Sequence, residues 1–171
     1  MRREVPPPRV LAIDPTSRGF GFAVLEGAGS LVDWGVRTVA GNRHTVAVSK
    51  LRELISLYRP DVLVVEDCTA PSSRRRVRVR RLLDELVQMV NGADIRTHRV
   101  SVREVHDLLA SNGRTNKHGI ASAIAEHFPE LVPRLPPERK IYMSEAERMA
   151  IFDATAFGLT YYFLTDAKAR H

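Results

Sequence analysis

The sequence predicts a single α/β domain in which helices cover both faces of a mixed β-sheet. Residues 10–14 and 61–67 are short, nearly continuous apolar runs, which is typical of strands buried on both faces. Between and after them lie segments whose apolar residues recur at helical spacing, the alternation expected of an α/β fold. One domain, residues 1–171, suits this length, because 44% of the residues are hydrophobic and can fill a single core.

Three strands are expected at the start of the chain. A proline-rich, extended lead-in at residues 1–8 precedes the first apolar run, and residues 19–26 and 31–40 follow as further strands. The turn sequence Gly-Ala-Gly-Ser at 27–30 separates the last two. These short connections fit an antiparallel meander.

A helix and a crossover come next. Residues 45–58 carry apolar side chains at roughly helical spacing, and Pro60 ends that helix before the apolar run at 61–67. A strand, a helix and a further strand imply a right-handed crossover between parallel strands. The strand at 61–67 is therefore expected to run parallel to its partner in the sheet.

The second half of the chain is mainly helical. Residues 94–100 predict a short fifth strand, and the pairs Ser101–Glu104 and Ser144–Glu147 match the capping box that opens a helix. The expected helices span residues 73–90, 101–110, 117–128 and 144–165, with a proline-rich loop at 129–143 and a frayed end at 166–171.

Two carboxylates end the two most apolar strands. If these strands are parallel neighbours, Asp14 and Glu66 emerge at the same edge of the sheet, and open α/β sheets bind ligands beyond the carboxyl ends of their strands. Alternatively, each carboxylate caps a strand end or the following turn. The occurrence of both in one chain favours a functional site.

A third carboxylate, Asp153, interrupts a largely apolar helix in which Ala150, Ala154 and Gly158 share its side and would allow close approach to the sheet. A buried carboxylate needs a cation opposite it, and a salt bridge to an arginine is one explanation. If all three carboxylates converge, a divalent cation removes their repulsion. Oxygen ligands indicate Mg²⁺, or Mn²⁺ in its place, and two such ions can clamp a phosphodiester.

Ordered motifs across nearly the whole chain resemble the RuvC family of Holliday-junction resolvases. LAIDPTSRGFGFAVLE at 11–26 is similar to the first strand pair of that family, VLVVED at 62–67 to its second acidic strand, and FDATAFGL at 152–159 to the start of its last helix. The resemblance implies a ribonuclease H-like fold with a five-stranded mixed sheet, an antiparallel meander followed by parallel strands. It also implies that Asp14, Glu66 and Asp153 are the metal ligands and catalytic residues.

The same resemblance implies a Mg²⁺-dependent endonuclease that cuts branched DNA as a homodimer by a two-metal-ion mechanism. One position departs from the family, which usually has an acidic residue or a histidine three positions before the last aspartate, where this chain has Ala150. The fourth ligand is therefore missing or comes from elsewhere. Two alternatives stay open: an RNA-processing nuclease of the same fold, and a nucleic-acid-binding module with impaired catalysis.

Arginine dominates residues 74–81, and the net charge is +6, which favours a polyanionic partner. Arginine suits bidentate contacts with phosphate, although a charge run can also be a solvated helix face. Arg114 and Lys117 equally well belong to a helix start capped by Thr115. The expected nucleic-acid contacts are Arg74, Arg75, Arg76, Arg78, Arg80, Arg81, Arg114 and Lys117.

Several classes of protein are disfavoured. Cys68 is the only cysteine, which excludes an internal disulfide, and no Cys/His spacing suggests structural zinc. No apolar run is long enough to cross a bilayer, and the first residues lack a signal-peptide core, so we expect a cytoplasmic protein without membrane contact. Actin-like kinases share a similar core but need two duplicated domains.

Overall fold

The computed structural model describes residues 5–41, 43–110, 113–138 and 147–170. At its centre lies a five-stranded sheet of order β3-β2-β1-β4-β5. The antiparallel part comprises β1 (Arg9–Thr16), β2 (Gly19–Glu26) and β3 (Leu31–Thr38), and the parallel part adds β4 (Val62–Glu66) and β5 (Arg96–Val100) beside β1. The predicted mixed sheet is confirmed.

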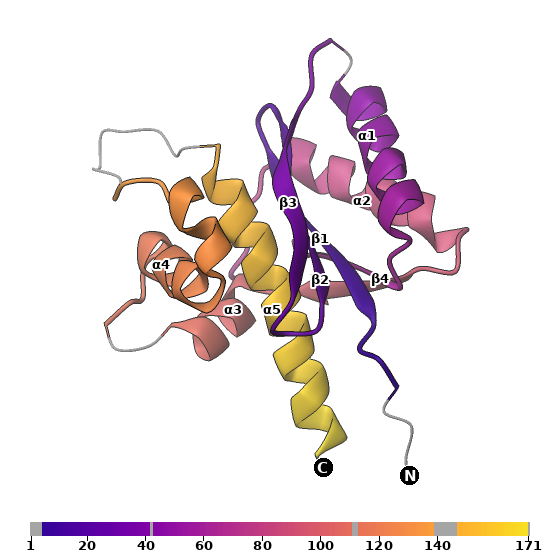
Figure 1. Ribbon diagram of the computed structural model, residues 1–171. Helices are drawn as coiled ribbons and strands as arrows, with labels where there is room; N and C mark the ends of the chain where they lie inside the picture. The colour runs from indigo at the N-terminus through magenta and orange to yellow at the C-terminus, as the bar shows by residue number, and fades with distance from the viewer. Residues whose placement is uncertain (1–4, 42, 111–112, 139–146, 171) are drawn as a thin grey trace.

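Helices cover both faces of this sheet (Figure 1). One face packs against α1 (Arg43–Tyr58) and α2 (Val77–Asn91). The other face packs against α3 (Val102–Leu109), α4 (Lys117–His127), a 3₁₀ helix (Pro129–Arg134) and α5 (Met149–Ala169). Among the residues so described, no helix is both long and apolar enough to span a membrane.

Alternation along the strands divides the core into two halves. Ala12 and Val64 belong to the half under α5, whereas Leu11 and Leu63 belong to the half under α1 and α2. All four side chains are at most 1% exposed. Alternate residues of β1 and β4 therefore pack against different helical layers: even-numbered residues against α5, and odd-numbered residues against α1 and α2.

Small residues bring α5 close to the sheet, as the sequence predicts. A Cβ atom added to Gly21 of β2 would collide with the backbone and Cβ of Ala150, and one added to Gly158 would collide with the side chain of Leu25. The helix thus crosses β2 directly beside β1, because Gly21 is the register partner of Asp14.

The start of α3 follows the predicted capping box. The Ser101 hydroxyl accepts a hydrogen bond from the Glu104 amide at 3.1 Å, and the Glu104 carboxylate accepts one from the Ser101 amide at 2.8 Å. This arrangement satisfies amides at the helix start and fixes where α3 leaves β5.

Other helix boundaries differ from those expected. α2 begins at Val77 rather than at residue 73. The sequence marks this start poorly, because the arginine-rich stretch before it has no apolar residues at helical spacing. α5 begins at Met149 rather than 144 and continues to Ala169, beyond the expected end at 165. The expected loop at 129–143 starts with the 3₁₀ helix. Of the second capping-box pair, Ser144 lies outside the described residues.

Candidate active site

Strand register brings Asp14 and Glu66 together. Parallel pairing of β1 with β4 runs as far as Ala12 and Val64, and each carboxylate lies two residues further along its strand. Because side chains alternate across a strand, Asp14 and Glu66 point to the same face as Ala12 and Val64, the face covered by α5. Both are buried, at 3% and 2% exposure, and β1 continues past Asp14 to Thr16.

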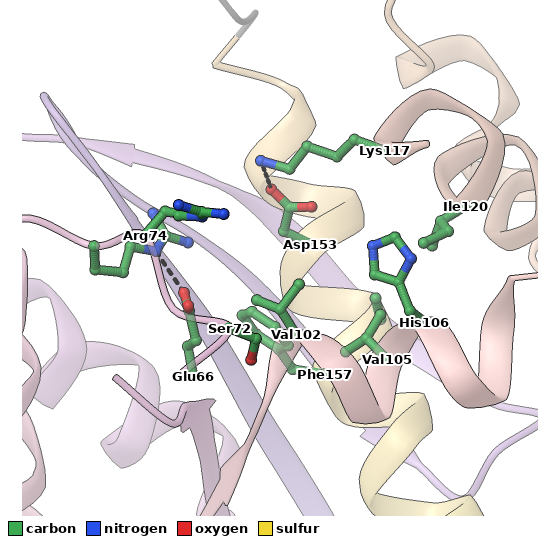
Figure 2. Close-up of a pocket in the computed structure, with 12 residues that line it drawn as sticks. Glu66, Ser72, Arg74, Val102, Val105, His106, Lys117, Ile120, Asp153 and Phe157 are labelled. Carbon is green, nitrogen blue, oxygen red and sulfur yellow. Dashed lines mark hydrogen bonds and ion pairs between the residues drawn. The ribbon is translucent and has the colours of Figure 1, made fainter. Parts of the chain in front are cut away.

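The third carboxylate reaches this place from α5. Asp153 lies just inside the start of that helix, and its Oδ2 atom is 2.8 Å from Nζ of Lys117 at the start of α4 (Figure 2). The negative charge of Asp153 acts on both Asp14 and Arg75. Three elements distant in sequence thus direct carboxylates into one region, and Asp153 pairs with a lysine, whereas the alternative explanation from the sequence was a salt bridge to an arginine.

Arg75 links the two strand carboxylates. Its Nε donates to Oε2 of Glu66 at 2.5 Å, its Nη2 donates to Oδ1 of Asp14, and its Nη1 donates to the Pro15 carbonyl at 3.1 Å. Burial lowers the pKa of Arg75, but the charges of Asp14, Glu66 and Asp153 together raise it by more, so the net shift is upward. The guanidinium therefore stays charged and neutralises part of the cluster.

The pKa of Asp14 is raised to about 8. Burial is the main cause, and the charges of Asp153 and Glu66 add to it, whereas those of Arg75 and Lys117 oppose it. The two cations thus compensate only part of the cost of a buried carboxylate. Asp14 gains from any further positive charge that arrives beside it.

The donor chemistry of this cluster fits a divalent cation. Carboxylate oxygens are the ligands that Mg²⁺ and Mn²⁺ prefer, and side-chain cations already face all three carboxylates. In the conformation described, however, no three Asp, Glu, His or Cys side chains of residues 5–41, 43–110, 113–138 and 147–170 are spaced to hold one ion. Because Arg75 bridges Asp14 and Glu66, a metal ion there requires Arg75 to move.

Ala150, which stands where the RuvC pattern has an acidic residue or a histidine, packs against the sheet. Ala150 is 2% exposed and lies against Gly21, the partner of Asp14 in β2. Glu147, an acid just before α5, lies 3.6 Å from Arg18 instead. The methyl group of Ala150 cannot ligate a metal. Within the part of the chain that the structure describes, the cluster therefore consists of the three carboxylates Asp14, Glu66 and Asp153.

The arginine segment borders a cavity of about 460 Å³ on the side of α1 and α2. Its basic lining comes from the loop after β4 and from the first turn of α2, and the β1–β2 turn adds two hydroxyls. With His44 of α1, the polar lining residues are Arg74, Arg75, Arg76, Arg78, Thr16 and Ser17. Such a concave surface with several guanidinium groups suits phosphate oxygens.

The remaining predicted contacts lie elsewhere or serve the fold. Arg80 donates from Nε to the Arg75 carbonyl at 3.1 Å, and Arg81 is exposed on α2. Arg114 pairs with Glu126 of α4 at 2.7 Å and lines neither of the two cavities beside the carboxylates. The cap of α4 is Asn116, which accepts from the Gly119 amide at 2.7 Å, and not Thr115.

Sequence reasoning missed the direct contact of Arg75 with Asp14 and Glu66. The available signal was charge balance: if three carboxylates are buried together, cations must face them, and Arg75 follows Glu66 by only nine residues. It also missed a second, mainly apolar cavity that opens beside Glu66 and Asp153.

The sequence matches no protein-family model and no curated protein. Among solved structures, RuvC of Thermus thermophilus superposes with a TM-score of 0.69 at 18% identity, over 94% of this chain and 96% of that one. The yeast mitochondrial Holliday junction resolvase Ydc2 gives 0.64 at 15% identity, over 97% and 82%. The Fowlpox virus resolvase, solved with Holliday junction DNA, gives 0.54 at 8% identity, over 93% and 98%. The chain therefore has the predicted ribonuclease H-like fold, in the form found in RuvC.

Proposed function

We propose that this chain is a divalent-metal-dependent endonuclease that hydrolyses phosphodiester bonds in branched DNA. The observation that carries the proposal is the convergence of Asp14, Glu66 and Asp153 from β1, β4 and α5 on one face of the sheet. Buried acids of this kind are costly and need positive charge, which a hydrolytic metal centre supplies.

Asp14, Glu66 and Asp153 would hold the metal, Mg²⁺ or Mn²⁺, as two ions. When bound, the metal lowers the pKa of a water molecule and stabilises charge on the departing oxygen. The chain's own cations have a separate task. Arg75 and Lys117 face carboxylates in the free protein, and they would exchange those partners for phosphate oxygens as the substrate arrives. Hydrolysis then breaks the bond to the 3′ oxygen and leaves 5′-phosphate and 3′-hydroxyl ends.

Branched DNA is favoured as the substrate by the neighbours of known structure. Thermus thermophilus RuvC and the Fowlpox virus resolvase were both solved with Holliday junctions. A homodimer would place two such carboxylate clusters on one junction and allow symmetric cuts. An RNA-processing nuclease of the same fold would use the same carboxylates, and comparing RNA with DNA junctions separates the two.

A second candidate function is nucleic-acid binding without cleavage. Two observations favour it: Ala150 supplies no fourth ligand, and Arg75 bridges two of the three carboxylates. In this case the arginine-lined cavity would hold DNA, and the carboxylates would serve only to position Arg75.

A cleavage assay on four-way junctions with Mg²⁺ or Mn²⁺ distinguishes the two candidates. We expect metal-dependent cutting by the wild type and its loss, by at least about 100-fold, in Asp14→Asn, because one ligand of the proposed centre is removed. Asp84→Asn, an exposed acid on α2 paired with Arg99, is the matched control and should cut normally. Tight junction binding with no cutting at any metal concentration would instead favour the binding module.

A further inference from the structure

A cavity of about 320 Å³ opens directly beside Glu66 and Asp153. Its lining is mainly apolar, with apolar side chains from α3, α4 and α5, and it also includes the charged groups of the carboxylate cluster. The apolar lining is Val102, Val105, Ile120, Ala156 and Phe157, and the polar lining is Glu66, Ser72, Arg74, Arg75, His106, Lys117 and Asp153. Figure 2 shows Val102, Val105 and Phe157 on one side of Asp153 and Lys117 on the other.

A cavity with one apolar part and one charged part matches the two parts of a nucleotide. The apolar side chains can contact the faces of a planar base, whereas the lysine and the arginines can bind phosphate. The volume lies at the low end of the range for small-molecule pockets, about 300–1,000 Å³, which suits one base rather than a larger ligand. The contents of the cavity would therefore be bound next to the phosphate that faces the carboxylates.

The larger, arginine-lined cavity would give the sugar–phosphate backbone of the DNA a separate path. Arg74 and Arg75 line both cavities, so the two spaces lie on either side of this short segment. The larger cavity adds Arg76 and Arg78 beside apolar side chains such as Ala47 and Leu82, whereas the smaller one adds apolar side chains of α3, α4 and α5. Phosphates following the arginines would pass the carboxylates at the border between the two, with the apolar cavity open to a neighbouring base.

We infer that the cavity between α3, α4 and α5 accepts one nucleobase adjacent to the phosphodiester held at the carboxylates, and that this base sets a preference for the cleavage position. The inference rests on the proposed nuclease function for the place of the phosphate. His106 and Ser72 are the polar lining residues outside the charged cluster, so they are the groups available to hydrogen-bond the edge of the base. The energy needed to unstack a base is smallest at a branch point, where stacking is already interrupted.

An abasic scan of a four-way junction tests this inference. A single tetrahydrofuran residue replaces the nucleoside at each position on either side of the cut. We expect the cleavage rate to fall at least about 5-fold for one position next to the cut and to change less than about 2-fold elsewhere, since stacking of one base on a protein is worth about 1–3 kcal/mol.

Two variants connect that position to the cavity. Val102→Phe fills the cavity from a half-buried site at the start of α3, and His106→Ala removes a polar lining group. Val102→Phe should cut the intact junction about as slowly as the wild type cuts the abasic one, with no further loss on the abasic substrate. His106→Ala should weaken the preference among the four bases. Val132→Phe, on the exposed surface of the 3₁₀ helix, is the matched control and should behave as wild type.

A binding readout keeps the test independent of cleavage. A junction with 2-aminopurine at each candidate position is titrated with protein in Ca²⁺, and the fluorescence change should occur at one position in the wild type and disappear in Val102→Phe. If this signal appears without any cutting in Mg²⁺ or Mn²⁺, the base site stands and the nuclease proposal fails. An abasic scan or a fluorescence titration with no position-specific effect overturns the base site, even if cutting is normal.

Discussion

Arg75 holds two buried carboxylates that would otherwise repel one another across the β1–β4 junction. It is 23% exposed at the side chain, whereas Asp14 and Glu66 are at most 4% exposed. A guanidinium in this position acts as an internal counter-ion in the metal-free protein. It would also compete with a divalent cation for the same oxygens. Removing Arg75 should therefore lower the stability of the metal-free protein and raise its affinity for the metal.

Arg75→Gln should destabilise the metal-free protein by about 3 kcal/mol, because two buried carboxylates lose their charged partner. The same change should tighten Mn²⁺ binding at least several-fold, since the competing cation is gone. Chemical denaturation with and without Mn²⁺ measures the first effect, and calorimetric titration the second. Arg81→Gln, on an exposed position of α2, is the control and should alter neither. Weaker Mn²⁺ binding in Arg75→Gln would show that Arg75 supports the metal site.

The raised pKa of Asp14 predicts a pH dependence of stability. Its pKa in the folded protein, about 8, exceeds the ordinary value of 3.8 for an aspartate, so this group favours folding most below about pH 4, and that contribution is lost as the pH rises towards 8. Without metal, the unfolding free energy of Asp14→Asn should therefore rise relative to that of the wild type across this window, by at least about 1 kcal/mol. Parallel denaturation curves at pH 5 and pH 8.5 measure the difference, and an unchanged difference contradicts the prediction. Saturating Mg²⁺ should remove the effect.

At the scale of elements, the position of α5 decides where Asp153 lies. The helix contacts β2 through Ala150 on Gly21, so the fit of two small residues sets the distance between α5 and the sheet. Gly21 needs no unusual backbone angle; it is needed because a Cβ would meet the helix backbone. The packing of α5 against β2 therefore brings the third carboxylate to the sheet, where it pairs with Lys117.

Gly21→Ala should destabilise the protein by about 1–3 kcal/mol, the usual range for overpacking a core. It should also reduce cleavage, because moving α5 shifts Asp153 away from Asp14. Gly29→Ala is the matched control: its added Cβ has no atom within 4 Å, so stability should change by less than about 0.5 kcal/mol. Thermal unfolding and the junction assay measure the two effects. Equal stability in both variants would show that the contact of α5 with β2 is not tight.

The sequence predicted the strands better than the helix starts, for physical reasons. Strands such as β1 and β4 are apolar on both faces, so their composition alone marks them. The start of α2 lies in an arginine-rich stretch where Val77 and Val79 alternate with arginines and give no helical spacing, and the loop before it turns Arg75 back over the strand ends. That turn depends on long-range contacts with Asp14 and Pro15, which no local pattern contains.

At the scale of the whole molecule, topology explains why three distant carboxylates were predictable as a set. Parallel neighbours and equal strand parity are general rules, and they place Asp14 and Glu66 on one face without knowledge of any loop. The sequence also shows that Ala150 stands where the RuvC pattern has an acidic residue or a histidine. The apolar cavity was not predictable, since it is formed by side chains of three helices whose mutual packing the sequence does not specify.

The distribution of charge over the molecule gives a last prediction. The net charge is +6, and we expect the arginines along the larger cavity to follow the nucleic-acid backbone. Each phosphate neutralised on duplex DNA contributes about 0.9 to the slope of log K against log salt. The double variant Arg76→Ala/Arg78→Ala should therefore lower that slope by about 2 in metal-free anisotropy titrations over a series of KCl concentrations. Arg103→Ala removes an arginine that is 83% exposed and paired with Asp107 on α3, and it should leave the slope unchanged. The same loss per arginine in both proteins would mean that net charge alone, rather than the arginine-lined cavity, holds the DNA.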